Sequence, residues 1–281
     1  MSYCEIFDIH APASTVFDAL LDEEILTSWL AENVRIEARK GGSFRFWGRD
    51  VIWCVAEEDT AGEIVELDRP HSLLFSWRWK DHSTRVSFQV EGSGADSRLS
   101  IEHHFESFDS GSDGPGPDMA GCHWRIAVGN LSSVLASRRP ALRPDYTALA
   151  KDGKQRVELE IELDASPERV FRALLDPAQV SVWMQAEAPE IDADAKRYSY
   201  GWRRGDAETE VGPVRILELV PNRLLVHDWQ WIDEPDGQVR WELSPTDSGT
   251  LLRLIHSESN DLTHALGWSD ALISIRRLVT G

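Results

Sequence analysis

The chain has 281 residues, a length that favours two domains, because single hydrophobic cores rarely exceed about 250 residues. Hydrophobic residues make up 42% and charged residues 27% of the chain, values of an ordinary globular protein that argue against disorder. The net charge is −19, so we expect neither nucleic acid nor an anionic membrane as a partner, since both are bound through clustered Lys and Arg.

The N-terminus and the cysteines predict a cytoplasmic protein. Residues 1–8 lack the basic and apolar segments of a secretion signal, and no apolar run reaches the roughly 18 residues of a membrane span. The cysteines Cys4, Cys54 and Cys122 are odd in number and far apart. They therefore predict neither a disulfide framework nor a cysteine metal site.

The chain contains an internal duplication. The segment from Val16 to Asp22 returns, with nearly the same residues, as the segment from Val170 to Asp176. Further matches follow in the same order along each copy: Trp29 and Trp183, Glu66-Leu67 and Glu218-Leu219, Trp77 and Trp229, Trp79 and Trp231, His103 and His256, and Trp124 and Trp268. A repeat of this length predicts a duplicated domain and not a short repeat array.

We therefore predict two domains, residues 1–138 and 156–281, joined by a linker over residues 139–155. The linker segment contains Pro140, Pro144 and Gly153 together with local positive charge, a composition typical of linkers. Within the first copy, residues 109–118 are too rich in Gly and Pro for a helix or a strand and predict a loop.

Each copy is predicted to follow one order of elements. An alternating strand opens the copy at residues 4–10 or 157–163, and two short helices follow it; Ser166-Pro167 suits an N-cap and a first helical position. Strands separated by turns then extend over residues 35–105 and 190–258. Apolar residues at helical spacing predict one longer helix at the end: Trp124, Val128, Leu131 and Leu135, or Trp268, Leu272, Ile275 and Val279.

This order predicts an α+β fold in which an antiparallel sheet wraps around the last helix of each copy. Trp77 and Trp79 share a strand face with Leu73, as Trp229 and Trp231 do with Leu225. These faces can form a plain aromatic core or line a ligand cavity, and the sequence leaves both open. The candidate ligand-binding residues are Trp77, Trp79, His103, Trp124, His227, Trp229, Trp231, Trp241, His256, Glu258 and Trp268.

One histidine recurs at the same strand position in both copies. His103 is in phase with Ile101, and His256 is in phase with Leu254 and Glu258, so we expect these side chains to point inward. Such an imidazole can anchor a ligand by a hydrogen bond, act as a general base, or be a satisfied core residue. If the protein is an enzyme, His256 and Glu258 are the acid-base candidates.

We predict no metal and no cofactor. His103 and His104 point to opposite faces of a strand, while Cys122 and His123 are neighbours on a helix, so neither pair can chelate an ion alone. The sequence also contains no Gly-rich phosphate loop, no G-x-S-x-G elbow and no HExxH motif.

The order of elements and the residues repeated in both copies resemble the START/SRPBCC superfamily, and within it the family named after the activator of the heat-shock protein 90 ATPase. The resemblance implies a helix-grip fold with a cavity between the sheet and the last helix, in a superfamily that mostly binds lipids, polyketides or other apolar molecules. The co-chaperone of that name carries a different N-terminal domain, which this sequence does not show, so we do not expect co-chaperone activity.

We therefore expect the protein to bind a small apolar or aromatic molecule in a tryptophan-lined cavity, without catalysis. Two alternatives remain: a cyclase-, dehydratase- or hydrolase-like enzyme, and a protein-interaction module in which the two copies form a pseudo-dimer. His227 and Glu258 replace Phe75 and Phe105 at matching positions. Since buried polar groups need partners or water, we expect the second copy to keep the more open and polar pocket.

Overall fold

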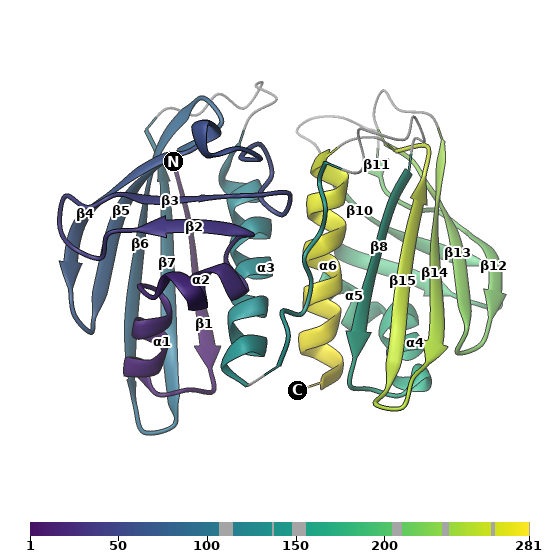
Figure 1. Ribbon diagram of the computed structural model, residues 1–281. Coiled ribbons are helices and arrows are strands. Elements are labelled where there is room, and N and C mark those ends of the chain that lie inside the picture. The colour runs from purple at the N-terminus through teal and green to yellow at the C-terminus, as the bar shows by residue number, and fades with distance from the viewer. Residues whose placement is uncertain are drawn as a thin grey trace. The chain divides into compact units, whose positions relative to one another are not determined.

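The computed structural model of the chain describes residues 1–106, 115–136, 138–147, 156–203, 210–231, 236–259 and 262–280. The chain divides into two compact units, Met1–Thr147 and Ala148–Gly281. Figure 1 shows the same order of elements in both units, with two short helices after the first strand and a long helix at the end. The duplication and the α+β fold predicted from the sequence are confirmed.

The first unit is built on a five-stranded antiparallel sheet with the strand order β1-β7-β6-β5-β4, beside a two-stranded sheet of β2 and β3. The long helix α3 contacts β1 and β7. The elements are β1 (Ser2–Ile9), α1 (Ala13–Ala19), α2 (Glu23–Trp29), β2 (Asn33–Ile36), β3 (Phe44–Trp47), η1 (Glu57–Asp59), β4 (Ala61–Asp68), β5 (Ser72–Trp79), β6 (His82–Ser93), β7 (Asp96–Phe105) and α3 (Pro117–Leu135).

The second unit repeats this plan with the strand order β12-β13-β14-β15-β8, beside a three-stranded sheet of β11, β10 and β9. The long helix α6 contacts β8. The elements are β8 (Arg156–Leu163), α4 (Pro167–Leu175), α5 (Pro177–Met184), β9 (Glu187–Asp192), β10 (Arg197–Arg203), β11 (Glu210–Val211), β12 (Ile216–Val220), β13 (Leu224–Trp229), β14 (Gly237–Pro245), β15 (Thr250–Ser257) and α6 (Leu262–Thr280).

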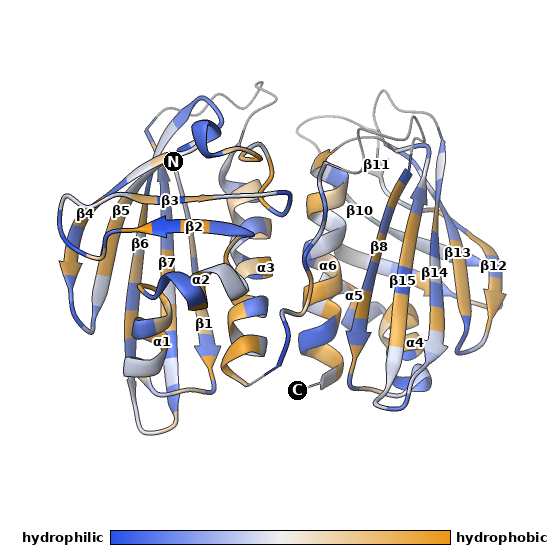
Figure 2. Cartoon of the chain, viewed as in Figure 1, coloured by the Kyte–Doolittle hydropathy of each residue, from blue (hydrophilic) through white to orange (hydrophobic). Residues whose placement is uncertain are grey.

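The core of each unit lies between the large sheet and the long helix. Hydrophobic and hydrophilic residues alternate along the strands in Figure 2, as expected for a sheet with one face in the core and one face exposed to solvent. On β7, Leu99, Ile101 and His103 are buried, whereas the residues between them are more exposed. The helix α3 buries Ala120, Trp124 and Leu131 against this face, which is the amphipathic pattern of its sequence.

The predicted linker is wrong over residues 139–147, which pack on the first unit. The Asn130 side chain of α3 donates to the carbonyl of Leu142 and accepts from its amide, both at 2.9 Å. Arg143 forms an ion pair with Asp50 at 3.0 Å. Leu142 and Tyr146 are buried, so these apolar side chains hold the segment although its composition is that of a linker. Residues 148–155 lie outside the described part of the chain.

None of the helices in the described part of the chain is long and apolar enough to cross a membrane.

The same indole hydrogen bond holds the short helices together in both units. Trp29 Nε1 donates to the carbonyl of Ala19 at 3.1 Å, and Trp183 Nε1 donates to the carbonyl of Ala173 at 2.8 Å. Both indoles are buried at 1% exposure, so each carbonyl would lose a buried partner if the indole were replaced.

We predict that Trp29→Phe and Trp183→Phe each lower the free energy of unfolding by about 1–3 kcal/mol, because each leaves a buried carbonyl without its donor. Urea unfolding of the full chain measures the loss. The control is Val182→Ala, an exposed neighbour of Trp183, which should stay within about 0.5 kcal/mol of the wild type. A Trp183→Phe protein as stable as the control would contradict the assigned role.

Candidate functional site

The interior of the first unit contains a stack of aromatic rings from β5 and β7, the two strands on either side of β6. The rings of Trp77 and Trp79 on β5 lie 4.7 Å apart between centroids with an angle of 11° between their planes. The His103 ring on β7 lies 5.5 Å from the Trp77 ring and 5.7 Å from the Trp79 ring. Trp77 Nε1 donates to Thr60 Oγ1 at 3.2 Å, and Trp79 Nε1 donates to the carbonyl of Ile52 at 3.0 Å. Each indole is therefore held in one orientation.

A tryptophan of the long helix fixes the tautomer of His103. Trp124 Nε1 on α3 donates to His103 Nδ1 at 3.1 Å. Burial lowers the pKa of His103 to about 3, with smaller contributions from His123 and His104, so the imidazole is neutral near pH 7. A neutral imidazole whose Nδ1 accepts carries its proton on Nε2. Among the described residues, this buried Nε2 has no hydrogen-bond partner.

A second histidine reaches the same cluster from the helix. The His123 ring on α3 lies 5.4 Å from the Trp77 ring and 5.7 Å from the Trp79 ring. Burial lowers the pKa of His123 to about 4, and within the described part of the chain its buried Nε2 has no partner either. From the sequence, His123 is predicted only as a possible metal ligand, and then rejected. Its spacing from the buried Ala120 and Ala127 already places it on the apolar stripe of the helix.

The second unit repeats the indole-to-imidazole bond. Trp268 Nε1 on α6 donates to His256 Nδ1 on β15 at 3.0 Å, and burial lowers the pKa of His256 to about 3. The Trp229 ring lies 5.4 Å from the His256 ring, and the half-buried Trp231 stacks on Trp229 at 6.3 Å. A helix histidine, His264, lies 5.2 Å from His256 between ring centroids. In each copy, the predicted strand tryptophan, strand histidine and helix tryptophan therefore lie close together: Trp77, His103 and Trp124, or Trp229, His256 and Trp268.

Two of the predicted site residues form a closed pair in the core of the second unit. Trp241 Nε1 donates to His227 Nε2 at 3.1 Å, which leaves the proton of this imidazole on Nδ1. That nitrogen donates to the carbonyl of Asp228 at 2.7 Å. Both ring nitrogens of His227 are satisfied within the protein, and burial lowers its pKa to about 4. His227 points inward as predicted, but as a satisfied core residue.

The prediction that Glu258 faces inward beside His256 is wrong. The strand β15 ends at Ser257, and Glu258 adopts a left-handed conformation with φ 58° and is exposed. Strand alternation stops where the backbone leaves the β region, so the phase of Glu258 does not follow from that of His256. His256 and Glu258 do not form an acid-base pair. The prediction of a more polar pocket in the second unit was based on His227 and Glu258, and neither residue supports it. Which unit has the larger pocket stays a prediction.

The described residues contain no group of three or more His, Cys, Asp or Glu side chains that can hold a metal ion. In particular, the two inward histidines of the first unit have no third protein ligand from this set, and structural zinc sites use four.

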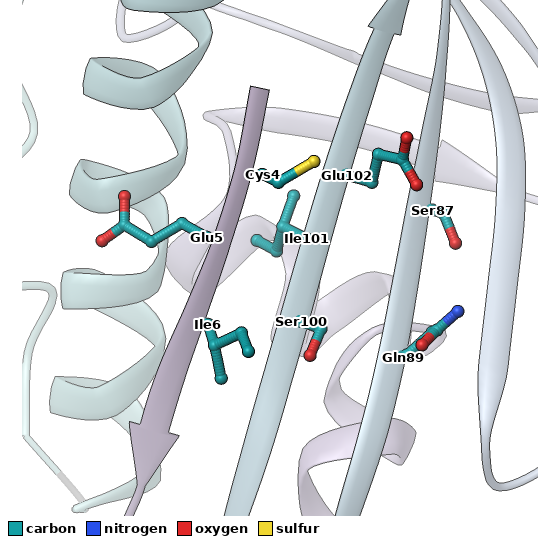
Figure 3. Close-up of a pocket in the computed structure, with 8 residues that line it drawn as sticks. All are labelled: Cys4, Glu5, Ile6, Ser87, Gln89, Ser100, Ile101 and Glu102. Atoms are coloured by element: carbon teal, nitrogen blue, oxygen red, sulfur yellow. The ribbon is translucent and has the colours of Figure 1, made fainter. Parts of the chain in front are cut away.

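A surface hollow of about 400 Å³ lies on the opposite, outward face of the first sheet (Figure 3). It is lined by Cys4, Glu5, Ile6, Ser87, Gln89, Ser100, Ile101 and Glu102. Partial burial raises the pKa of the Cys4 thiol, and the charge of Glu102 adds to the rise. None of the residues predicted from the sequence to bind a ligand lines this hollow.

The two units define a pair of helix-grip domains, each with a neutral histidine held by a tryptophan of the gripped helix. The chain belongs to the family described as activator of Hsp90 ATPase homolog 1-like protein, whose model matches residues 10–135 and 164–280. The family predicted by resemblance is confirmed, in two tandem copies. No curated protein matches the chain significantly.

Solved structures similar to the chain include one- and two-domain proteins. DynU16, from the dynemicin biosynthetic locus, is 17% identical with a TM-score of 0.42, over 99% of this chain and 97% of that chain. StfQ, a di-domain ARO/CYC of the steffimycin biosynthetic pathway, is 11% identical with a TM-score of 0.35, over 98% and 97%. CV1439 from Chromobacterium violaceum is 27% identical with a TM-score of 0.38, over 45% and 98%. At these TM-scores the likenesses say nothing about function.

The buried histidines predict that stability falls as the pH drops from about 6.5 towards 4. The pKa of histidine is about 6.5 in an unfolded chain, whereas that of folded His227 is about 4. Between these values the unfolded chain binds more protons, so lowering the pH favours unfolding. The first unit has Phe75 and Phe88 at the positions that correspond to His227 and Trp241. The double variant His227→Phe/Trp241→Phe therefore places in the second unit a pair of side chains that the fold already accommodates in the first.

In the double variant we expect the slope of unfolding free energy against pH to be smaller by up to about 1.4 kcal/mol per pH unit. Urea unfolding of the full chain at several pH values measures this slope. The control is Leu225→Val, which removes a buried methylene but no titrating group, so it should lower stability equally at every pH. An unchanged slope in the double variant would show that His227 is not held neutral by the fold.

Proposed function

We propose that this protein binds a small apolar or aromatic molecule between the sheet and the long helix of its first unit. The observation that supports this most is the pair of buried Nε2 atoms, of His103 and His123, beside the two stacked indoles. A buried polar atom without a partner costs about 1–3 kcal/mol, and native proteins satisfy such atoms with a ligand or ordered water. Indole faces favour a flat aromatic molecule.

Family membership supports the fold of this site more than its ligand. The positions shared by the two copies, such as Trp29 and Trp183, are largely packing positions, and packing positions specify a fold without naming a molecule. The proposal therefore rests on His103, His123 and their indole neighbours and not on the name of the family. The pseudo-dimeric interaction module stays a prediction.

Binding is a better proposal than catalysis for this site. The buried polar side chains described in the first unit are Thr60, Thr84, Ser97, His103, His123, Asn130 and Ser133. This set contains no carboxylate, so an acid-base mechanism would have to use a histidine whose pKa lies far below its operating pH. A hydrogen bond that anchors a ligand does not require the histidine to take up or release a proton.

The packing of the site predicts slow entry of the ligand. Trp77, Trp79 and Trp124 are each exposed by 1% or less, so a molecule that contacts their rings must displace packed side chains on its way in. Binding that requires such a rearrangement has an association rate below the usual range for preformed sites.

We predict that 2-ethylnaphthalene, a flat apolar probe, binds the full chain saturably and shifts the indole N–H resonances of Trp77, Trp79 and Trp124 in ¹⁵N-correlated NMR spectra. The bound and free forms should give separate signals because exchange is slow. Trp229, Trp241 and Trp268 in the second unit are controls within the same spectrum, and their resonances should not move. Shifts confined to the second unit, or no saturable binding by equilibrium dialysis, would overturn the proposal.

A further inference from the structure

The proton on His103 Nε2 gives the proposed site a donor in a fixed direction. Trp124, which holds Nδ1, is itself fixed, because its ring packs edge-on against Phe88 at 5.3 Å with 90° between the planes. An imidazole held from one side by a packed indole cannot turn to satisfy its other nitrogen elsewhere. His103 therefore presents a preorganised N–H inside the core.

Aromatic rings lie around His103, and no residue in the described part of the chain accepts a hydrogen bond from its Nε2. The His103 ring stacks on Phe105 at 4.6 Å and 23°, and the Trp77 and Trp79 rings lie within 5.7 Å. Contacts of N–H groups with aromatic faces are weak compared with a bond to oxygen. A molecule that places an oxygen against His103 Nε2 while its rings lie on the indoles would satisfy both features of the site.

The charge of the site restricts that molecule further. The buried polar side chains of the first unit, in the part of the chain described, include no Lys and no Arg, and both His103 and His123 are neutral near pH 7. An anion entering the site would lose its hydration without gaining a counter-charge, which is costly. Carboxylates are therefore unsuitable ligands, whereas a neutral carbonyl is suitable.

Hydrogen bonds within the protein engage more of the imidazole nitrogens in the second unit. His264 Nδ1 is hydrogen-bonded to Ser259 Oγ at 2.7 Å, and His227 uses both ring nitrogens within the protein. In the first unit, the buried Nε2 atoms of His103 and His123 have no partner among the residues that the structure describes. Recognition of an oxygen is thus assigned to the first unit.

We propose, on the basis of the function proposed above, that the first unit selects neutral aromatic molecules that carry a hydrogen-bond acceptor, such as aryl ketones, and that His103 Nε2–H donates to this acceptor. Trp124 acts as a positioning residue for the donor. His123 lines the same site from the helix.

A matched set of three probes tests this inference. 2-Acetylnaphthalene and 2-ethylnaphthalene have nearly the same shape, but only the ketone carries an acceptor, and 2-naphthoate replaces it with an anion. In equilibrium dialysis with the full chain, the ketone should bind at least about tenfold more tightly than the ethyl compound. The naphthoate should show no binding at concentrations that saturate the protein with ketone.

The variants locate the donor. His103→Phe should reduce the ratio of the two affinities to near one, whereas the matched change His256→Phe in the second unit, outside the proposed site, should leave the ratio unchanged. Both variants leave an indole without its acceptor, so they share any general destabilisation. If His103→Phe does not fold, Trp124→Phe removes the bond that fixes the proton and should lower the ratio by a smaller factor.

The possible failures are distinguishable. If none of the three probes binds, the proposed function itself fails. If the ketone and the ethyl compound bind equally, or if the ratio is lost in His256→Phe and kept in His103→Phe, binding stands but selection by His103 is overturned. Tighter binding of the naphthoate than of the ketone would overturn the inference that the ligand is neutral.

Discussion

One hydrogen bond from the last helix to the last strand organises the interior of each unit. The indole N–H of Trp124 or Trp268 donates to Nδ1 of His103 or His256, at 3.1 and 3.0 Å. This bond joins the two layers of the fold at a buried polar point, where a missing partner would cost about 1–3 kcal/mol. It also fixes the tautomer of the histidine: burial keeps the imidazole neutral, and the bond to Nδ1 leaves the proton on Nε2.

The two copies use this shared bond in cores of different polarity. Phe75 in the first unit corresponds to His227 in the second, and Phe88 corresponds to Trp241. The polar version is balanced, because Trp241 donates to His227 and His227 donates to a backbone carbonyl. Tyr198, whose ring packs on His227 at 4.7 Å, likewise donates its hydroxyl to the carbonyl of Leu174. His227, Trp241 and Tyr198 are thus satisfied by partners within the second unit.

The sequence predicted the features of the fold that depend on periodicity. The repeat, the inward tryptophans and the inward His103 and His256 all follow from period two in strands and from helical spacing at the end of each copy. Glu258 was misplaced because a single residue with positive φ ends the alternation, and nothing in the sequence marks it. The partners of His227 were missed because one is a side chain on another strand, Trp241, and the other is the backbone carbonyl of Asp228. Residues 139–147 were misread because two apolar side chains outweighed the composition.

The central claim is that a tryptophan of the last helix fixes His103 as a neutral donor on Nε2. Long-range ¹⁵N–¹H correlation spectra of the ¹⁵N-histidine-labelled protein near pH 7 report the protonation of each ring nitrogen directly. The account predicts an unprotonated Nδ1 and a protonated Nε2 for both His103 and His256, with the resonances assigned from single substitutions. A proton on His103 Nδ1, or an imidazolium at this pH, would contradict it.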